Sequence, residues 1–255
     1  MEQTALNELK SILNDTESGS AEILEKINSF IITHNYKLSE LKSAIKEIDT
    51  QFPLFAGIQT YLLELYSLLA SNSIDEIVRF AKKFNSDLKA KFKRIYQNAQ
   101  FILQNHNRII SISNSHTLFK YFQFAQNNNQ KFAIFILESQ PCGEGKTFYS
   151  KLKSIEIDAK LREDSQLKET VQQIDAAIIG CDMISESGFV VNKIGSRHLA
   201  EECRDFNKPF YVLGDNSKII SDKTLMQKIN HSSKTIRGEL FEIIEKDLIT
   251  QIITD

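Results

Sequence analysis

The chain has 255 residues, enough for one large domain or two smaller ones, and 31 Lys and Arg residues nearly balance 33 Asp and Glu residues. The net charge of −2 excludes a strongly basic surface, so nucleic acid is not the first partner to consider. Three cysteines, an odd number without a Cys-x-x-Cys pair, indicate reduced thiols rather than a disulfide framework. Without a His-Glu-x-x-His pattern either, we expect no metal site.

The first residues, MEQTALNELK, lack the basic start and apolar stretch of a signal peptide. The apolar segments of the chain are all far shorter than a membrane span. We therefore expect a cytoplasmic protein that has no membrane partner.

Apolar residues recur at helical spacing through residues 1–106, which predicts an all-helical first domain. After the first helix, the expected helices begin at Ser18 or Ser20, at Ser39, at Leu54 and at Ser73. The last of these is the longest and runs to about residue 106. Its start has the spacing of a capping box, with Ser73 three residues before Glu76.

Beyond residue 106, short apolar runs alternate with helical stretches, which predicts a second domain at 107–255 with a parallel sheet covered on both faces. Strands are expected at 108–113, 132–137, 155–159, 176–180 and 209–213. Helices are expected at 118–125, at 146–153, up to about 173, and at 197–206. No Gly-x-Gly-x-x-Gly pattern follows the first strand, so a dinucleotide is not indicated, and we expect no cofactor.

The stretch DAAIIGCDMISESGFVVNKIGS, residues 175–196, holds the strongest site candidates. Asp182 follows the buried strand 176–180, and a turn and a second apolar run lead to Asn192 and Lys193. Ser196 is then the expected N-cap of a helix. Because ligands of open α/β sheets bind beyond the carboxyl ends of the strands, this order predicts a site for a small anion such as a sugar phosphate. The alternatives are an Asp182 that only forms a turn and a Lys193 that is only solvated.

Polar residues also follow the first two strands of the second domain. Ser115 can hold a phosphate together with the backbone N–H groups of the next helix, or it can serve only as the N-cap of that helix. Glu138 can bond a ligand hydroxyl or only neighbouring backbone. Lys146 can neutralise a phosphate or simply be solvated. His116 is more typical of a packing or surface residue than of an acid–base catalyst.

GCDMISESGFVVNKIGS, residues 180–196, resembles the signature of the family that joins the α, β and δ subunits of eukaryotic translation initiation factor 2B to two sugar-phosphate isomerases. The isomerases act on 5-methylthioribose 1-phosphate and ribose 1,5-bisphosphate. Further motifs of that family are similar to NDTESGSAEI at 14–23, ESQPCGEGK at 138–146, KPFYVLGDNSKI at 208–219 and FEIIEKDLITQIITD at 241–255. The resemblance implies an α/β fold, with an N-terminal helical domain followed by a Rossmann-like parallel-sheet domain.

The resemblance also assigns residues, and the chain departs from the pattern of the isomerases at three places. Asp182 stands at the family's catalytic aspartate, but Ser113 stands where the isomerases carry a catalytic cysteine. Gln140 replaces a phosphate-binding arginine. The isomerases also carry an arginine soon after the glycine that matches Gly19, and here Ser20, Ala21 and Glu22 follow instead. A serine hydroxyl is a far weaker acid than a thiol and needs an adjacent base to react. These departures argue against efficient isomerisation.

Three functions stay open. In the first, the protein is a regulatory or scaffold subunit with a degenerate pocket for a sugar phosphate or nucleotide. Such a subunit would associate through its C-terminal domain, as a homodimer or with related subunits, and initiation factor 2 is a possible partner. In the second, it is an aldose-phosphate to ketose-phosphate isomerase: Asp182 moves a proton and Ser113 replaces the cysteine. Asn192 and Lys193 would then orient the sugar, and Ser115 with Lys146 would hold the phosphate. The third is a small-molecule sensor without a role in translation.

Overall fold

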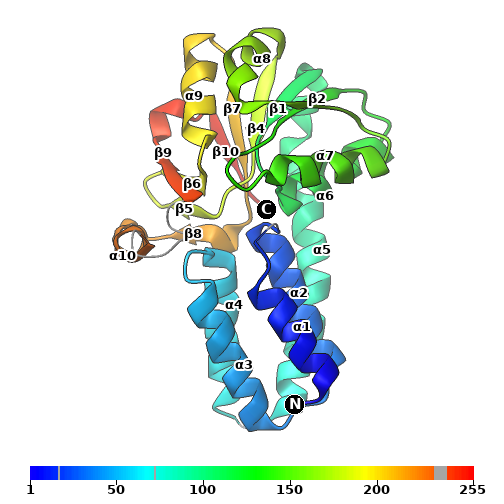
Figure 1. The fold of residues 1–255 in the computed structure, drawn as a ribbon, viewed down its shortest axis with the longest axis vertical. Helices are drawn as coiled ribbons and strands as arrows, with labels where there is room; N and C mark the ends of the chain where they lie inside the picture. Colours follow the sequence, from blue (N-terminus) through cyan, green and yellow to red (C-terminus); the bar gives the residue numbers. More distant parts are fainter. Residues whose placement is uncertain (17, 72, 233–239) are drawn as a thin grey trace.

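The computed structural model describes residues 1–16, 18–71, 73–232 and 240–255. Its first part is a layer of helices, α1 (Gln3–Leu13), α2 (Ser20–Thr33), α3 (Leu38–Gln51), α4 (Ala56–Leu69) and α5 (Ile74–Asn105). Figure 1 shows these helices side by side below the α/β part of the molecule. The apolar stripes read from the sequence meet in one core, in which Phe30, Ile45 and Leu65 are fully buried.

Helix α5 connects the two halves of the molecule. Ser73 caps its start, because the Ser73 hydroxyl accepts a hydrogen bond from the Glu76 backbone N–H at 3.4 Å. The Glu76 side chain, the other half of the predicted capping box, accepts a hydrogen bond from Ser71 Oγ at 2.7 Å. Ile77, near its start, belongs to the helical core, whereas Leu88 to Leu103 pack in a second core over the main sheet. The predicted division between residues 106 and 107 falls between α5 and the first strand, and it stays a prediction.

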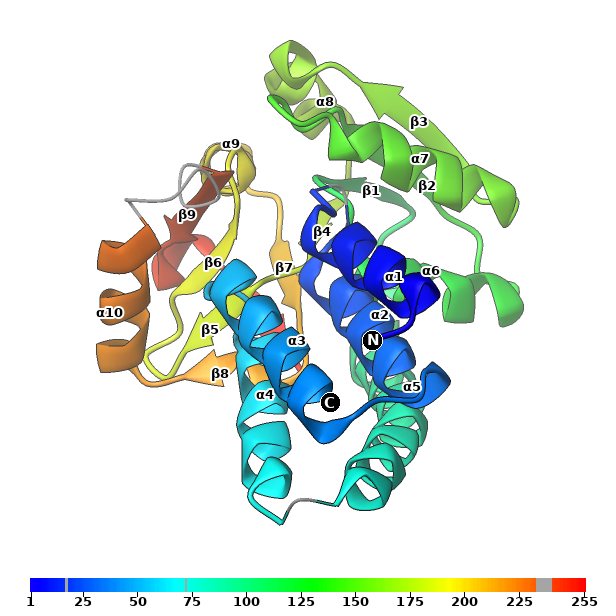
Figure 2. The same ribbon diagram turned by 60° about the horizontal axis from the view of Figure 1, so that its bottom comes forward.

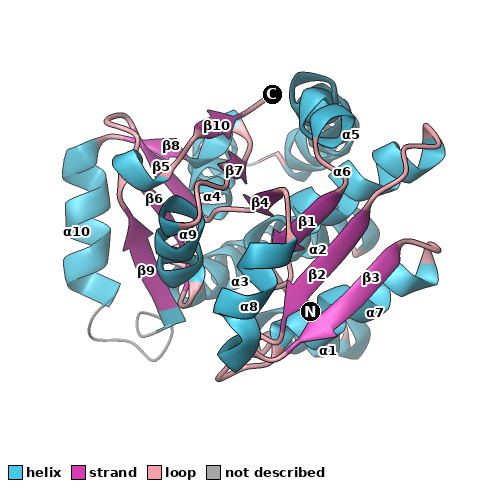
Figure 3. Cartoon of the chain, turned by 90° about the horizontal axis from the view of Figure 1, so that it is seen from above, coloured by secondary structure: helices cyan, strands magenta, loops and turns pink. Residues whose placement is uncertain are grey.

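The main sheet has six parallel strands in the order β10-β7-β4-β1-β2-β3 (Figure 3). The strands are β1 (Arg108–Ser111), β2 (Ala133–Leu137), β3 (Asp158–Arg162), β4 (Ala176–Ile179), β7 (Phe210–Leu213) and β10 (Gln251–Ile253). Helices α6 (His116–Asn127) and α7 (Glu144–Ser154) pack with α5 on one face, and α8 (Leu167–Gln173) and α9 (Ser196–Asp205) pack on the other. The predicted α/β class, with a covered parallel sheet, is therefore confirmed.

A second, four-stranded sheet was not expected. It has the order β8-β5-β6-β9, with β5 (Met183–Ser185), β6 (Val190–Lys193), β8 (Ile219–Ile220) and β9 (Phe241–Ile244), and α10 (Asp222–Ser232) packs beside it (Figure 2). The predicted turn at Ser187-Gly188 joins β5 to β6, and Gly188 has a φ of +95°. Its strands have only two to four residues, too few to show a period in the sequence, which is why the sheet was missed.

Several predicted boundaries were wrong. The strand expected at 155–159 lies at Asp158–Arg162, because the N–H groups of Ile155 and Ile157 close the end of α7 by bonding Leu152 O at 3.2 Å. Helix α7 begins at Glu144, before the expected Lys146. The helix ending at 173 begins only at Leu167, after the 3-10 turn Asp164–Gln166.

The described parts of the chain contain no helix that is both long and apolar enough to cross a membrane. They also contain no group of three or more His, Cys, Asp or Glu side chains able to hold a metal ion.

Candidate functional site

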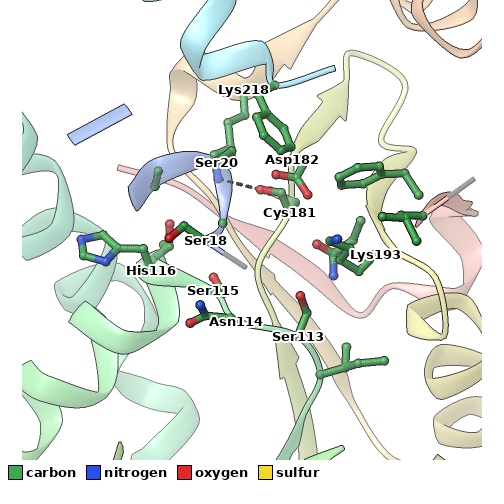
Figure 4. A pocket seen from close by; sticks show the side chains of 18 of the residues that line it. Ser18, Ser20, Ser113, Asn114, Ser115, His116, Cys181, Asp182, Lys193 and Lys218 are labelled. Carbon is green, nitrogen blue, oxygen red and sulfur yellow. Dashed lines mark hydrogen bonds between the residues drawn. The ribbon is translucent and has the colours of Figure 1, made fainter. Parts of the chain in front are cut away.

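A pocket lies beyond the carboxyl ends of β1 and β4, where the helical layer meets the main sheet (Figure 4). It has about 640 Å³ of empty space, including the part that opens to solvent. The helical part lines it with Thr16, Ser18, Gly19, Ser20, Ala21 and Phe55, and the α/β part lines it with residues 112–117, Cys181, Asp182, Asn192, Lys193, Lys218, Leu240 and Phe241. The position is the usual one for ligands of open α/β sheets.

Five of the seven predicted site residues line this one pocket, namely Ser113, Ser115, Asp182, Asn192 and Lys193. Glu138 and Lys146 are not among its lining residues. They form an ion pair with each other at 3.2 Å, and the Lys146 side chain is 55% exposed. Lys146 therefore matches the alternative of a solvated surface lysine.

Ser113 ends the first strand in a constrained conformation. Its φ is +68°, in the left-handed region that residues other than glycine seldom adopt. The Ser113 N–H donates a hydrogen bond to Ser139 Oγ at 2.7 Å, and this bond holds the turn. Within the described residues, the Ser113 hydroxyl makes no hydrogen bond to a carboxylate or an imidazole. No base among the described residues is therefore hydrogen-bonded to it.

Asp182 is buried, and none of the described residues donates a hydrogen bond to its side chain. The residue is 7% exposed, and its N–H donates to Val191 O at 2.8 Å, which fixes the backbone beside β6. Among the described residues, the carboxylate forms no hydrogen bond or ion pair, and it lies beside Cys181 in the pocket (Figure 4). A buried carboxylate without donors is unfavourable, so this group is ready to accept hydrogen bonds from a ligand.

The Lys193 ammonium group contacts other side chains of the protein and is largely shielded from solvent. Its Nζ lies 2.5 Å from Glu144 Oε1 and 5.1 Å from the centre of the Phe241 ring, and the side chain is 16% exposed. The adjacent Asn192 is fixed by its amide, which donates to Ser196 Oγ at 2.9 Å. The contact with Glu144 was not predicted, since a residue in the first turn of a helix gives no sequence signal of a buried ion pair.

Lys218 is a pocket residue that sequence reasoning missed. It is 3% exposed, and its Nζ donates to Cys181 O at 2.6 Å. Burial lowers the pKa of Lys218, but the nearby Cys181, Asp215 and Asp182 outweigh burial, so the pKa is raised above its ordinary value. The sequence carried a weak signal, because Lys218 follows the turn at the carboxyl end of a predicted strand. That turn is real, and Asp215 Oδ1 accepts a hydrogen bond from the Ser217 N–H at 3.0 Å.

The helix that follows Lys193 does not point a free N-terminus at the pocket. Gly195, with a φ of +93°, is the N-cap of α9, so the prediction of Ser196 as N-cap was wrong. The Glu242 carboxylate already accepts a hydrogen bond from the Arg197 N–H at 2.8 Å. Burial keeps the pKa of Glu242 raised, although hydrogen bonds from the backbone of this helix start pull it down.

The starts of α2 and α6 line the pocket instead. Ser115 is the N-cap of α6, and its Oγ accepts a hydrogen bond from the Leu118 N–H at 3.3 Å. Gly19 is the N-cap of α2, and it lies so close to β1 that an added Cβ would be 2.7 Å from Asn114 O. Two helix N-termini thus bring their partial positive charge to one wall of the pocket.

The remaining reactive side chains of the pocket are unsuited to acid–base work. Burial raises the pKa of the Cys181 thiol to about 12, so this thiol is no substitute for a catalytic cysteine at neutral pH. His116 Nε2 lies 3.1 Å from Glu25 Oε1, and the ring stacks edge-on against Phe92. Figure 4 shows the imidazole pointing away from the pocket, in agreement with a packing role.

The fold and the pocket define a class of protein: a helical domain joined to a Rossmann-like sheet, with a pocket between them. The chain belongs to the Initiation factor 2 subunit family, whose family model matches residues 1–255. This finding confirms the resemblance seen in the sequence.

Relatives in this family carry two kinds of name. A putative translation initiation factor eIF-2B subunit 2-like protein of Pyrococcus abyssi is 26% identical over 86% of this chain and 79% of its own length. A ribose 1,5-bisphosphate isomerase of Archaeoglobus fulgidus is 23% identical over 67% of this chain and 51% of its own length. The family therefore includes initiation-factor-like proteins and isomerases, and membership alone does not decide between them.

Solved structures show the same fold. The translation initiation factor eIF-2B of Pyrococcus horikoshii matches with a TM-score of 0.79 and 21% identity, over 100% of this chain and 96% of that one. A chain of the tetrameric eIF2B-beta2-delta2 complex from Chaetomium thermophilum matches with a TM-score of 0.75 and 15% identity, over 100% and 91% of the two chains. That second relative is a subunit of a hetero-oligomer.

Proposed function

We propose that this protein is a regulatory or scaffold subunit of the initiation factor 2B type, whose pocket binds a phosphorylated sugar or nucleotide without isomerising it. The state of Ser113 carries the proposal. It occupies the position of the family's catalytic cysteine, and among the described residues its hydroxyl makes no hydrogen bond to a carboxylate or an imidazole. The thiol of Cys181 is no replacement, because burial raises its pKa to about 12.

Binding does not require the lost cysteine. A phosphate group at the starts of α2 and α6 would meet backbone N–H groups and the Ser115 hydroxyl. Among the described residues, that hydroxyl accepts a hydrogen bond but donates none. The Asp182 carboxylate, which accepts no hydrogen bond from the described residues, would accept hydrogen bonds from ligand hydroxyls. Asn192 and Lys193 would orient the rest of the ligand. Phe55 and Phe241, with ring centres 5.8 Å apart, form an apolar wall suited to a sugar face or a base.

Assembly is the second part of the proposal. The protein associates through its C-terminal domain, with a second copy or with related subunits, and initiation factor 2 is the candidate partner. The names of the relatives and the hetero-oligomeric eIF2B-beta2-delta2 complex support this. Native mass spectrometry of the purified chain tests self-association, and affinity capture tests binding to initiation factor 2. If the chain is monomeric and captures no translation factor, a small-molecule sensor replaces the scaffold.

An isomerase remains the second candidate, and a specific observation favours it. Asp182 and Ser113 line the same pocket, and the Asp182 carboxylate is buried without a partner among the described residues. A carboxylate in that state can take a proton from a sugar carbon or hydroxyl. The two candidates therefore differ in whether the bound ligand turns over.

The deciding experiment incubates pure protein with ribose 1,5-bisphosphate and, separately, with 5-methylthioribose 1-phosphate. Calorimetry reports binding and NMR spectroscopy reports any ketose product. We expect binding without product. Turnover that disappears in Asp182→Asn but persists in Asp205→Asn, a surface change 58% exposed in the wild type, overturns the scaffold in favour of the isomerase.

A further inference from the structure

One of the two lysines that line the pocket, Lys193, is already neutralised. Lys193 Nζ lies 2.5 Å from Glu144 Oε1, and Glu144 is only 4% exposed. A pair so close and so shielded from water is much stronger than a surface salt bridge. A ligand anion can therefore gain from the charge of Lys193 only by sharing it with Glu144.

The fold keeps the Glu144 carboxylate in place. Glu144 is the first residue of α7, after the left-handed Gly143, and a carboxylate in this position is favoured by the helix dipole. The next residue, Gly145, is pressed against β2, where an added Cβ would lie 1.8 Å from Leu137 O. The helix start is thus wedged against the sheet, so Glu144 cannot withdraw with its backbone when a ligand arrives.

The other lysine that lines the pocket is also close to carboxylates. Lys218 is the second buried ammonium group, and it interacts with the carboxylates of Asp182 and Asp215. Each lysine in the pocket lining is therefore offset by at least one nearby carboxylate. A small inorganic anion would meet a pocket without net positive charge, and only the helix starts would attract it.

We infer that Glu144 is a specificity-determining residue, which offsets Lys193 so that phosphate alone is a poor ligand. This inference rests on the proposed function of the pocket as a site for phosphorylated ligands. A sugar phosphate gains what a bare anion lacks, because its hydroxyl groups can donate to the Asp182 carboxylate, which accepts no hydrogen bond from the described residues. Glu144 thus makes occupancy depend on the whole ligand and protects the pocket from the inorganic phosphate of the cell.

The chain offers a matched control. Glu138 forms an ion pair with Lys146 at 3.2 Å on the same segment, but neither residue lines the pocket. Glu144→Gln and Glu138→Gln therefore remove the same charge from neighbouring positions, and only the first change frees a pocket lysine. Both substitutions keep the shape and the hydrogen-bonding ability of the side chain.

The test measures the Kd of inorganic phosphate by calorimetry for the wild type and both variants. A carboxylate within a few ångströms of a bound anion weakens its binding by about tenfold or more. We expect Glu144→Gln to bind phosphate about tenfold more tightly than the wild type, and Glu138→Gln to match the wild type. The gain should vanish in the double variant Glu144→Gln/Lys193→Met. An unchanged or weaker affinity in Glu144→Gln overturns the inference.

A second measurement needs no variant. A wild-type crystal soaked in phosphate should keep the contact between Lys193 and Glu144, whereas phosphate bound on Lys193 with Glu144 turned away contradicts the inference. Failure of the proposed function gives a different result: the wild type then binds neither ribose 1,5-bisphosphate nor 5-methylthioribose 1-phosphate. A wild type that binds a sugar phosphate, together with an unchanged Glu144→Gln, rejects only the role of Glu144.

Discussion

Replacing Lys218 by Met should destabilise the folded protein more than any other single lysine change in the α/β part. Lys218 is 3% exposed, and its ammonium group donates to Cys181 O at 2.6 Å. Methionine has a similar length and fills the same space, so the substitution removes the charge and its hydrogen bond with little change in packing.

Two losses add in this variant. A hydrogen bond to a charged group contributes about 1.5–3 kcal/mol to stability. In addition, Asp182 and Asp215 lose the positive charge that offsets them, and removing one partner of a buried charge cluster costs about 3–5 kcal/mol in all. We therefore expect the free energy of unfolding to fall by about 3 kcal/mol, which corresponds to a decrease in Tm of roughly 6–9 °C.

Urea and thermal unfolding at pH 7 measure this loss, with Lys223→Met as the control because Lys223 is exposed on α10. Since the pKa of Lys218 is raised in the folded state, its contribution is complete below the ordinary value of 10.5 and is lost only as the pH rises through the folded value. The difference between wild type and variant should therefore be constant from pH 7 to 9. A loss below about 1 kcal/mol, equal to that of the control, would refute the reasoning.

Three further predictions follow from single contacts. Asp175→Asn should lower the free energy of unfolding by about 1 kcal/mol at pH 7, because the carboxylate accepts hydrogen bonds from Asn107 N–H and Arg108 N–H at 3.0 and 2.9 Å. Burial raises the pKa of Asp175, but hydrogen bonds from Arg108 outweigh burial and leave the pKa below 3.8. The difference in free energy of unfolding between wild type and variant, measured by urea titration, should therefore shrink as the pH falls through that lowered pKa. Gly19→Ala should weaken sugar-phosphate binding in calorimetry, because its Cβ would lie 2.7 Å from Asn114 O and push the start of α2 away, and unchanged binding contradicts this. Ser73→Ala should lower the urea midpoint by the equivalent of about 0.5–1 kcal/mol through loss of the α5 cap, whereas Ser86→Ala, within the same helix, serves as its control.

The sequence predicted the fold correctly where an apolar pattern repeats over many residues. Helix α5, with 32 residues and a strong apolar stripe, was placed within a residue at each end, and the five predicted parallel strands are all present. The second sheet was missed because β5 and β8 have only three and two residues. The displaced strand near 158 shows the other limit: Ile155 and Ile157 are apolar because they close α7, not because they form a strand.

The candidate site was predicted best where residues follow one strand in sequence. Asp182, Asn192 and Lys193 are connected through a single hairpin, so their meeting in one pocket could be inferred from their order. Lys218 lines the same pocket from a separate segment, and Glu144 contacts Lys193 from another. No local pattern indicates that a lysine or a glutamate will be buried. The helix start that lines the pocket was also unexpected, because α2 belongs to the other half of the chain.

That contribution of α2 ties the pocket to the arrangement of the two halves. The Lys151 ammonium group on α7 donates to Glu22 Oε2 at 2.6 Å and to Asn114 Oδ1 at 3.3 Å, so it joins the first turn of α2 to the end of β1. A ligand bound between Gly19 and Asp182 would contact both halves at once. Its binding energy would then favour the arrangement in which the two halves meet. Coupling of this kind is reciprocal: a change in the helical layer that stabilises this arrangement would raise ligand affinity by the factor by which the ligand stabilises it. A subunit of the proposed type could act in this way, because such coupling needs binding but no chemistry.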